Sequence, residues 1–215
     1  MAFGIIFDMD GVLVDSPKFS FAALNKVLSA HNVNISMRDK KNYLGRPLEK
    51  IINDLHPHLN PHFNEISKQT WLQEKVFIKE TGQNKPALMH LLKEIKKQKI
   101  PICVGTSSPL WRAKEILKIL KIQKFFNQMV TGEDVQNHKP HPDVFLTAAK
   151  KLKLTPKQCI VIEDAHSGIE AAQRAGMKVI AIATEFNSKK ELSHADLVIE
   201  DFSELSIEKI KALLN

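Results

Sequence analysis

Short apolar runs alternate with helical patterns from residue 86 to the end of the sequence, and this alternation limits the possible folds most. Helical spacing is clearest where apolar side chains recur at i, i+3, i+4 and i+7, at Leu88, Leu91, Leu92 and Ile95. The apolar runs with the character of strands are 100–105, 129–132, 159–162, 179–183 and 197–199. Strands that alternate with helices in this way predict an α/β fold with a parallel sheet.

The N-terminal third of the chain has a different pattern. Residues 3–7 form a further apolar strand candidate, and a charged segment follows them at once. Residues 16–84 carry helical patterns and no convincing strand. We therefore expect a core made of residues 1–15 and 85–215, with an α-helical insert at residues 16–84.

Composition is that of an ordinary globular chain, with 215 residues of which 43% are hydrophobic and 26% charged. No apolar run approaches the roughly 18 residues that span a membrane, and no signal peptide is recognisable. Cys103 and Cys159 lie among Ile and Val, as free thiols do in a reducing compartment. We expect a cytoplasmic protein that does not bind membranes.

The net charge of +7 would suit nucleic acid, anionic membrane or small acidic substrates. Several lysines, however, lie near the end of a predicted helix, where cations offset the helix dipole: Lys93, Lys96, Lys97 and Lys99. Aromatic residues do not interleave with these lysines as they do on surfaces that bind single strands. We expect no nucleic-acid partner, and the sequence implies no protein partner.

Two aspartates directly follow the first predicted strand, in the segment FDMDGVLVDS at residues 7–16. In an extended chain the side chains of Asp8 and Asp10 share one face, and the carboxyl ends of parallel strands are where open sheets bind ligands. Two such close carboxylates need a cation, or one must hold a proton. Gly11 allows the sharp turn that the chain then makes.

Polar clusters also follow three later strands. They are Thr-Ser-Ser at 106–108, His-Lys-Pro at 138–140, and Glu-Asp-Ala-His-Ser-Gly at 163–168. Thr106 and nearby amides can donate to phosphate oxygens, and Lys139 can neutralise an anion. Glu163 and Asp164 can complete a site for a hard cation. Together these groups predict phosphoryl chemistry.

The order and spacing of these segments resemble those of the haloacid dehalogenase-like hydrolases, in the branch with β-phosphoglucomutases and phosphoglycolate phosphatases. The first segment fits the pattern DxDGxxxDS, the third continues as KPHPDVF at 139–145, and the fourth continues as GIEAA at 168–172. The resemblance covers nearly the whole chain. It implies a three-layer Rossmannoid core with a parallel sheet, and a helical cap at residues 16–84 that closes over the site.

The resemblance also implies roles for individual residues. Asp8 would be the nucleophile that forms an aspartyl-phosphate, ionised at pH 7 if its pKa is the ordinary ~3.9. Asp10 would be the general acid and base. The implied cofactor is Mg²⁺, with the ligands Asp8, Asp10 (through its backbone carbonyl), Glu163 and Asp164. The implied phosphate-binding groups are Thr106, the Ser107 amide and Lys139.

The activity that the resemblance implies is Mg²⁺-dependent hydrolysis of the phosphate monoesters of small metabolites. Asp10 favours phosphate esters, because dehalogenases of this superfamily lack that acid. The alternatives are a β-phosphoglucomutase-type sugar phosphomutase and, less favoured, a noncatalytic nucleic-acid-binding or regulatory protein. Ser20 stands where mutases have a histidine that suppresses hydrolysis, so the sequence favours the hydrolase.

Residues 45–47, Gly-Arg-Pro, resemble a cap loop written GRS in relatives, in which Arg46 would approach an anionic substrate. Pro47 replaces the usual serine.

Three histidines adjoin the motifs, and a surface or packing role is favoured for each: His138, His141 and His166. Trp111 falls in a helical pattern, and we expect it to be a packing residue.

Overall fold

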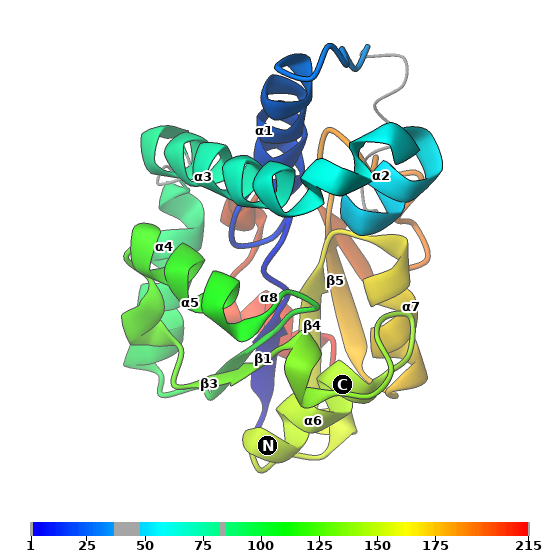
Figure 1. Ribbon diagram of the computed structural model, residues 1–215. Helices are drawn as coiled ribbons and strands as arrows, with labels where there is room; N and C mark the ends of the chain where they lie inside the picture. The colour runs from blue at the N-terminus through cyan, green and yellow to red at the C-terminus, as the bar shows by residue number, and fades with distance from the viewer. Residues whose placement is uncertain (1, 37–47, 82–84, 215) are drawn as a thin grey trace. The chain divides into compact units, whose positions relative to one another are not determined.

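The computed structural model describes residues 2–36, 48–81 and 85–214. The chain divides into two compact units. Unit 1 comprises Met1–Val14 and Asn84–Asn215, and unit 2 comprises Asp15–Gln83. Figure 1 labels the helices and strands of both.

Unit 1 is built on a six-stranded parallel sheet with the strand order β3-β2-β1-β4-β5-β6. The strands are β1 (Gly4–Phe7), β2 (Ile102–Gly105), β3 (Gln128–Val130), β4 (Cys159–Glu163), β5 (Lys178–Ile182) and β6 (Leu197–Ile199). The helices are α4 (Pro86–Lys97), α5 (Leu110–Ile119), α6 (Asp143–Lys151), α7 (His166–Arg174) and α8 (Ile207–Ala212). The α/β class with a parallel sheet that the sequence predicts is confirmed.

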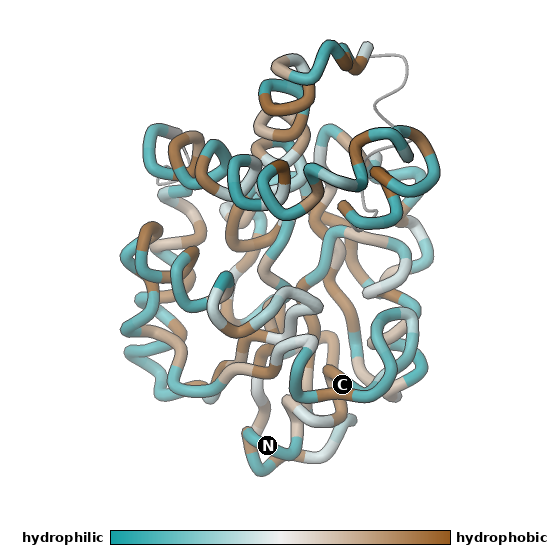
Figure 2. Tube along the Cα trace, in the orientation of Figure 1, coloured by the Kyte–Doolittle hydropathy of each residue, from teal (hydrophilic) through white to brown (hydrophobic). Residues whose placement is uncertain are grey.

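The core of unit 1 surrounds the central strands on both faces. Ile5, Ile6 and Phe7 of β1 are fully buried although their side chains alternate between faces, as in sheets covered by helices on both sides. Buried side chains of α6 and α7, such as Phe145 and Ile169, share a cluster with Ile6. Helices flank the sheet on both sides in Figure 1, and Figure 2 shows the strands as largely hydrophobic.

Two strand boundaries differ from the predicted ones for local reasons. The strand expected at 100–105 begins at Ile102, after Pro101, which has no amide hydrogen for a sheet bond. The strand expected at 129–132 ends at Val130, because Thr131 begins a short 3₁₀ turn, η4 (Gly132–Asp134). The Asp134 carboxylate accepts bonds from the Thr131 amide and hydroxyl, at 2.8 and 2.9 Å, and these close the turn.

The regular structure of unit 2 consists of helices, with no strand among its described residues. It contains α1 (Ser16–Ser29), α2 (Leu48–Leu55), the 3₁₀ helix η2 (Pro57–His62) and α3 (Phe63–Thr81). Its core is a cluster of buried apolar side chains that includes Leu24, Leu28, Ile52 and Ile66. Ser20 of α1 donates a hydrogen bond to the Glu74 carboxylate of α3 at 2.8 Å.

Within the described ranges, every helix is too short or too polar to cross a lipid bilayer.

Candidate functional site

The residues that the sequence singles out converge at the carboxyl end of the sheet of unit 1. Asp8 follows β1, Thr106 follows β2 and Glu163 ends β4, and β1 lies between β2 and β4. Three chain segments therefore end side by side, and their polar side chains meet at one edge. All three residues are at least 95% buried, with 5% exposure for Asp8, 1% for Thr106 and 2% for Glu163.

Lys139 connects the first and last of these segments. Its Nζ donates to Asp8 Oδ1 at 2.5 Å and to Glu163 Oε1 at 2.7 Å, and it also reaches the carbonyl of Gly105 at 3.3 Å. The same ammonium group lies 4.8 Å from the centre of the Phe145 ring, a contact that favours its positive charge. Burial disfavours that charge, but Asp8 and Glu163 outweigh burial and raise the pKa of Lys139. Lys139 is therefore a fixed cation between two carboxylates.

Both oxygens of Glu163 have partners. While Oε1 accepts from Lys139, Oε2 accepts from the backbone amides of Asp164 and Ala165, at 2.7 and 2.8 Å. Gly168, in the first turn of α7, makes room for this carboxylate, because a Cβ there would lie 1.6 Å from Glu163 Oε1. The glycine is needed for the carboxylate to keep its place.

The side chain of Asp164 depends on a second glycine. Gly11 has φ of +85°, and a Cβ there would lie 1.9 Å from Asp164 Oδ2. The turn after β1 thus brings its backbone against this carboxylate, which only glycine permits. The backbone of Asp164 is held by Asn187, whose side-chain amide donates to the Asp164 carbonyl at 2.9 Å.

Asp8, Glu163 and Asp164 form a buried carboxylate cluster, and each offers an oxygen within 4.8 Å of the others. If all three were ionised, these carboxylates and the one ammonium group would leave a net negative charge in a buried site. An all-oxygen, anionic donor set of this kind suits a hard divalent cation. The cluster is thus compatible with a metal ion.

The pKa values of two carboxyl groups in the cluster are raised, first by burial and then by their acidic neighbours. Burial, opposed by Lys139 and reinforced by Glu163 and Asp10, raises the pKa of Asp8 to about 8. Burial, with added repulsion from Glu163 and Asp8, also raises the pKa of Asp164 well above its ordinary value. The expectation of an ordinary pKa for Asp8 is wrong for the protein without a bound cation, because desolvation in the folded site was not visible in the sequence.

Asp10 has a different set of partners from Asp8. Arg112 Nη1 donates to Asp10 Oδ1 at 2.8 Å and to Oδ2 at 3.1 Å, and the Ser108 hydroxyl donates to Oδ2 at 2.8 Å. Arg112 also contacts the Ser108 oxygen at 2.6 Å. The side chain of Asp10 is 30% exposed, so it is accessible while its position is fixed. Such an oriented carboxylate is suited to proton transfer.

The loop after β2 presents hydrogen-bond donors. The Thr106 oxygen accepts from the Ser108 amide at 3.0 Å, which leaves its own hydroxyl hydrogen available to donate. Within the described ranges, no acceptor is found for the backbone amides of Ser107 and Met9. The loop after β2 and the turn after β1 therefore both offer donors to an anion.

The structure thus brings together Asp8, Thr106, Lys139, Glu163 and Asp164, with Asp10 and Ser107 on adjoining turns. Arg46 and its neighbours in 45–47 lie outside the described residues.

The three histidines beside the motifs are exposed. His141 Nδ1 lies 2.8 Å from Asp143 Oδ1, and the His166 ring stacks on His194 with centroids 5.0 Å apart. Trp111 is 55% exposed, so the expectation of a packing role is wrong. The apolar face of α5 is formed instead by residues such as Ala113 and Ile116.

Sequence reasoning missed two contacts of the site. Arg112 falls in a predicted helical pattern, which gave it no functional role. The available signal was its place in the first turn of a helix, where a cation is unfavourable to the helix dipole and an acidic partner compensates for it. Asn187 comes from a loop after β5, and no local pattern connects it with Asp164.

Known proteins resemble this chain along most of its length. Residues 5–182 match the model of the family described as haloacid dehalogenase-like hydrolase. The phosphorylated carbohydrates phosphatase of Thermotoga maritima is 29% identical over 197 residues, which cover 90% of this chain and 91% of that enzyme. The fructose-1-phosphate phosphatase of Escherichia coli is 29% identical over 183 residues, covering 83% of this chain and 95% of that enzyme.

A solved structure shows the same fold. The crystal structure of β-phosphoglucomutase from Clostridium difficile matches with a TM-score of 0.81 and 26% identity, over 100% of this chain and 98% of that one. The family match runs from β1 to the end of β5 and includes Asp8, Lys139 and Asp164. This chain belongs to the haloacid dehalogenase-like hydrolases.

Proposed function

We propose that this protein is a Mg²⁺-dependent phosphatase that hydrolyses phosphate monoesters of small metabolites through a phosphoryl group carried by Asp8. The observation that carries the proposal is the arrangement of Asp8 between Lys139 and two further buried carboxylates, with the accessible Asp10 two residues away. Relatives named as phosphatases of phosphorylated carbohydrates and of fructose 1-phosphate support this substrate class.

The residues present fit Mg²⁺. The donors are carboxylate oxygens, and burial together with repulsion between these carboxylates raises the pKa values of Asp8 and Asp164, which a bound cation would oppose. Asp8 and Asp164 would hold the ion with the backbone carbonyl of Asp10, while Glu163, whose oxygens are both engaged, would act through water. When bound, Mg²⁺ supplies charge neutralisation for the carboxylates and for the phosphate oxygens.

Asp8 acts as the nucleophile in this proposal. Lys139 holds one of its oxygens, which fixes the carboxylate and leaves the other oxygen for attack on phosphorus. A new O–P bond forms to Asp8 as the bond from phosphorus to the leaving alkoxide breaks. Water later attacks the same phosphorus, releases inorganic phosphate and restores the Asp8 carboxylate.

Asp10 transfers the proton in both steps. It protonates the leaving alkoxide in the first step, and as a carboxylate it then takes a proton from the attacking water. Arg112 and Ser108 orient its two oxygens. This orientation matters because proton transfer requires hydrogen-bond distance to the reacting oxygen.

The remaining donors stabilise the transferring phosphoryl group. Thr106, the amide of Ser107 and Lys139 surround the position next to Asp8, and they match the charge that spreads over the phosphoryl oxygens. The amide of Met9 adds a further donor.

Unit 2 is proposed to act as the cap that selects the leaving group, with Arg46 as a contact for anionic substrates. A cytoplasmic location is also part of the proposal, supported by Cys103 and Cys159, which are both buried and free.

The test is hydrolysis of p-nitrophenyl phosphate and of a panel of phosphorylated sugars, with Mg²⁺ and with EDTA. We expect Mg²⁺-dependent release of phosphate, which EDTA abolishes and Asp8→Asn eliminates. A matched control is Asp143→Asn. Asp143 is an aspartate near the loop that carries Lys139, and its own contacts are with Asn137 and His141. If the intact protein released phosphate from none of these esters, the proposal would be contradicted.

A sugar phosphomutase remains the second candidate, because the Clostridium difficile structure is named β-phosphoglucomutase. Ser20 argues against it. Its hydroxyl is already bonded to buried Glu74, and it lacks the ionisable ring that mutases have at this place. Incubation with β-glucose 1-phosphate, catalytic glucose 1,6-bisphosphate and Mg²⁺ distinguishes the two. We expect free phosphate; rapid formation of glucose 6-phosphate with little phosphate would establish the mutase.

A further inference from the structure

A hollow lies at the opposite end of the sheet from the carboxylate cluster. It has a volume of about 380 Å³ and opens where β2 and β3 begin, at Ile102 and Gln128. Four-residue β2 separates it from Thr106, a span of roughly 13 Å at the usual rise of a strand. The volume falls within the roughly 300–1,000 Å³ range of sites for small molecules.

The lining of this hollow is strongly basic. It contains five lysines and no aspartate or glutamate: Lys96, Lys99, Lys124, Lys151 and Lys153. Lys151 is already engaged, since its Nζ donates to the Met129 carbonyl at 2.7 Å and lies 3.3 Å from Asp134 Oδ1. Within the described ranges, none of the other four lysines has a carboxylate partner.

The plainer interpretation is that these lysines only offset helix dipoles, because α4 ends at Lys97 and α6 ends at Lys151. The negative charge of these helix ends is smaller than the positive charge of the lysines. Each helix end carries about half a negative charge, so two ends offset about one of the four unpaired ammonium groups. A net charge of about three remains for an outside partner to neutralise.

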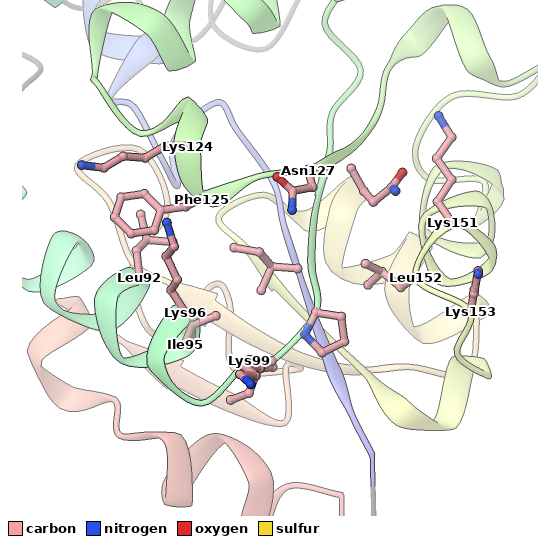
Figure 3. Close-up of a pocket in the computed structure, with 14 residues that line it drawn as sticks. Leu92, Ile95, Lys96, Lys99, Lys124, Phe125, Asn127, Lys151, Leu152 and Lys153 are labelled. Atoms are coloured by element: carbon pink, nitrogen blue, oxygen red, sulfur yellow. The ribbon is translucent and has the colours of Figure 1, made fainter.

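Two of these ammonium groups lie near one aromatic ring. Lys96 Nζ lies 5.7 Å and Lys124 Nζ 5.5 Å from the centre of the Phe125 ring. Figure 3 shows Lys96 and Phe125 on one side of the hollow and Lys151 with Lys153 on the other. Positive charge thus borders the hollow from both sides, which suits a ligand with more than one anionic group.

The rest of the lining is apolar, with two side-chain amides. The apolar side chains include Leu92, Ile95, Ile100, Pro101 and Leu152. The amides belong to Asn127 and Gln128, and neither side chain has a hydrogen-bond partner in the described part of the chain. Apolar surface next to free donors and acceptors fits a flat ring with polar edges.

We propose that this basic hollow binds a small polyanion that carries a planar ring, of the chemical type of a nucleoside triphosphate. The lysines neutralise the anionic chain, the apolar surface covers the ring, and the two amides pair with its polar edge. The site lies apart from the phosphatase residues and requires none of them.

The test is calorimetric titration of the whole protein with ATP, in EDTA so that hydrolysis does not interfere. Inorganic triphosphate, which has only the anionic chain, and adenosine, which has no phosphate, serve as comparison ligands. We expect ATP to bind at one site, more tightly than triphosphate, and adenosine alone not to bind measurably. Equal affinities for ATP and triphosphate, or no binding of ATP, would overturn the proposal.

Charge reversals at the end of α4 supply a matched pair of variants. Lys96→Glu with Lys99→Glu, in the last turn of α4 and just beyond it, changes the hollow, whereas Lys93→Glu with Lys97→Glu makes the same change in charge on α4 outside the hollow. The first pair is expected to weaken ATP binding by about tenfold or more, equivalent to about 1.4 kcal/mol, and the second by less than about threefold. Equal losses in the two pairs would mean that only the net charge matters and would refute the site.

Two further measurements keep the test decisive. Phosphatase activity toward p-nitrophenyl phosphate reports folding of each variant, and Lys124→Glu replaces the first pair if that pair does not fold. Amide hydrogen exchange maps the bound ATP. Protection is expected at 95–102 and 123–128, and protection confined to 106–112 would place the ATP at the phosphatase residues instead.

Discussion

Arg112 bonds both carboxylate oxygens of Asp10 through a single nitrogen, at 2.8 and 3.1 Å. The arginine side chain is 14% exposed and Asp10 30%, so water competes only partly for this ion pair. The pair connects the turn after β1 with the first turn of α5, and it fixes the orientation of the residue to which we assign proton transfer.

Replacement of Arg112 by alanine is therefore expected to slow turnover. Asp10 would keep its bond from the Ser108 hydroxyl but lose its fixed orientation, so we expect kcat to fall by about tenfold. This is part of the ~10²–10⁴-fold rate increase that general acid–base catalysis contributes. The loss should be larger for an alkyl phosphate, which needs its leaving group protonated, than for p-nitrophenyl phosphate. Steady-state kinetics with both esters measure this difference.

Lys178→Ala is the control, because Lys178 forms a surface ion pair with Asp196 at the opposite end of β5 from the site. It should leave both rates within about twofold, as surface ion pairs contribute little. If Arg112→Ala lowered kcat equally for the two esters, a specific role in orienting the proton donor would be refuted.

Gly168→Ala is expected to weaken metal binding. The added methyl group would overlap Glu163 Oε1 and push the carboxylate away from Lys139 and from the cluster. Loss of such a supporting contact typically lowers metal affinity by about 10–100-fold. Activity measured against Mg²⁺ concentration should therefore require more Mg²⁺ and approach the wild-type rate only at high concentration.

Ser167→Ala, the neighbouring change in the same first turn of α7, is the matched control and should leave the Mg²⁺ requirement unchanged. An unaltered Mg²⁺ requirement in Gly168→Ala would show that the position of Glu163 does not determine metal affinity.

The buried carboxylates predict how stability depends on pH without metal. The folded-state pKa of Asp8 is raised from 3.8 to about 8, so its contribution to stability is fully present below 3.8 and is lost as pH rises through about 8. Asp164, with a pKa also raised, acts in the same direction. In EDTA, the melting temperature should thus fall between pH 5 and pH 8, by at least about 2 °C.

Mg²⁺ should reverse this trend, because the cation favours the charged carboxylates, and should raise the melting temperature more at pH 8 than at pH 5. Asp8→Asn removes one of the titrating groups and should flatten the pH dependence in EDTA. A melting temperature that rises with pH in EDTA, in the wild-type protein, would show that the cluster does not control stability in this range.

Much of the fold of unit 1 could be predicted because its signals are local. The apolar runs that became β4, β5 and β6 differ from the predicted runs by one residue at most, since buried parallel strands are continuously apolar. Strand ends were less predictable. The end of β3 depends on the side-chain bonds between Thr131 and Asp134, and these exist only once the turn has formed.

The residues of the candidate site also differ in how far the sequence could predict them. Asp8, Lys139, Glu163 and Asp164 could be singled out because each follows or adjoins a predicted strand, and the sheet brings such segments together. Arg112 could not be identified, because it lies within the pattern of helix α5 and not directly after a predicted strand. The raised pKa of Asp8 is a property of burial in the assembled site, so no reading of local sequence could supply it.

In the proposed mechanism, Asp8 carries the phosphoryl group during turnover. The most direct measurement mixes the protein with Mg²⁺ and p-nitrophenyl phosphate, quenches the reaction with acid within milliseconds, and locates the added phosphoryl group by peptide mass spectrometry. We expect one phosphoryl group on the peptide that contains Asp8 and none in Asp8→Asn, whose turnover should be below about one thousandth of the wild-type rate. A phosphoryl group on another residue, or Asp8→Asn turnover above that level, would contradict the assignment of Asp8 as the nucleophile.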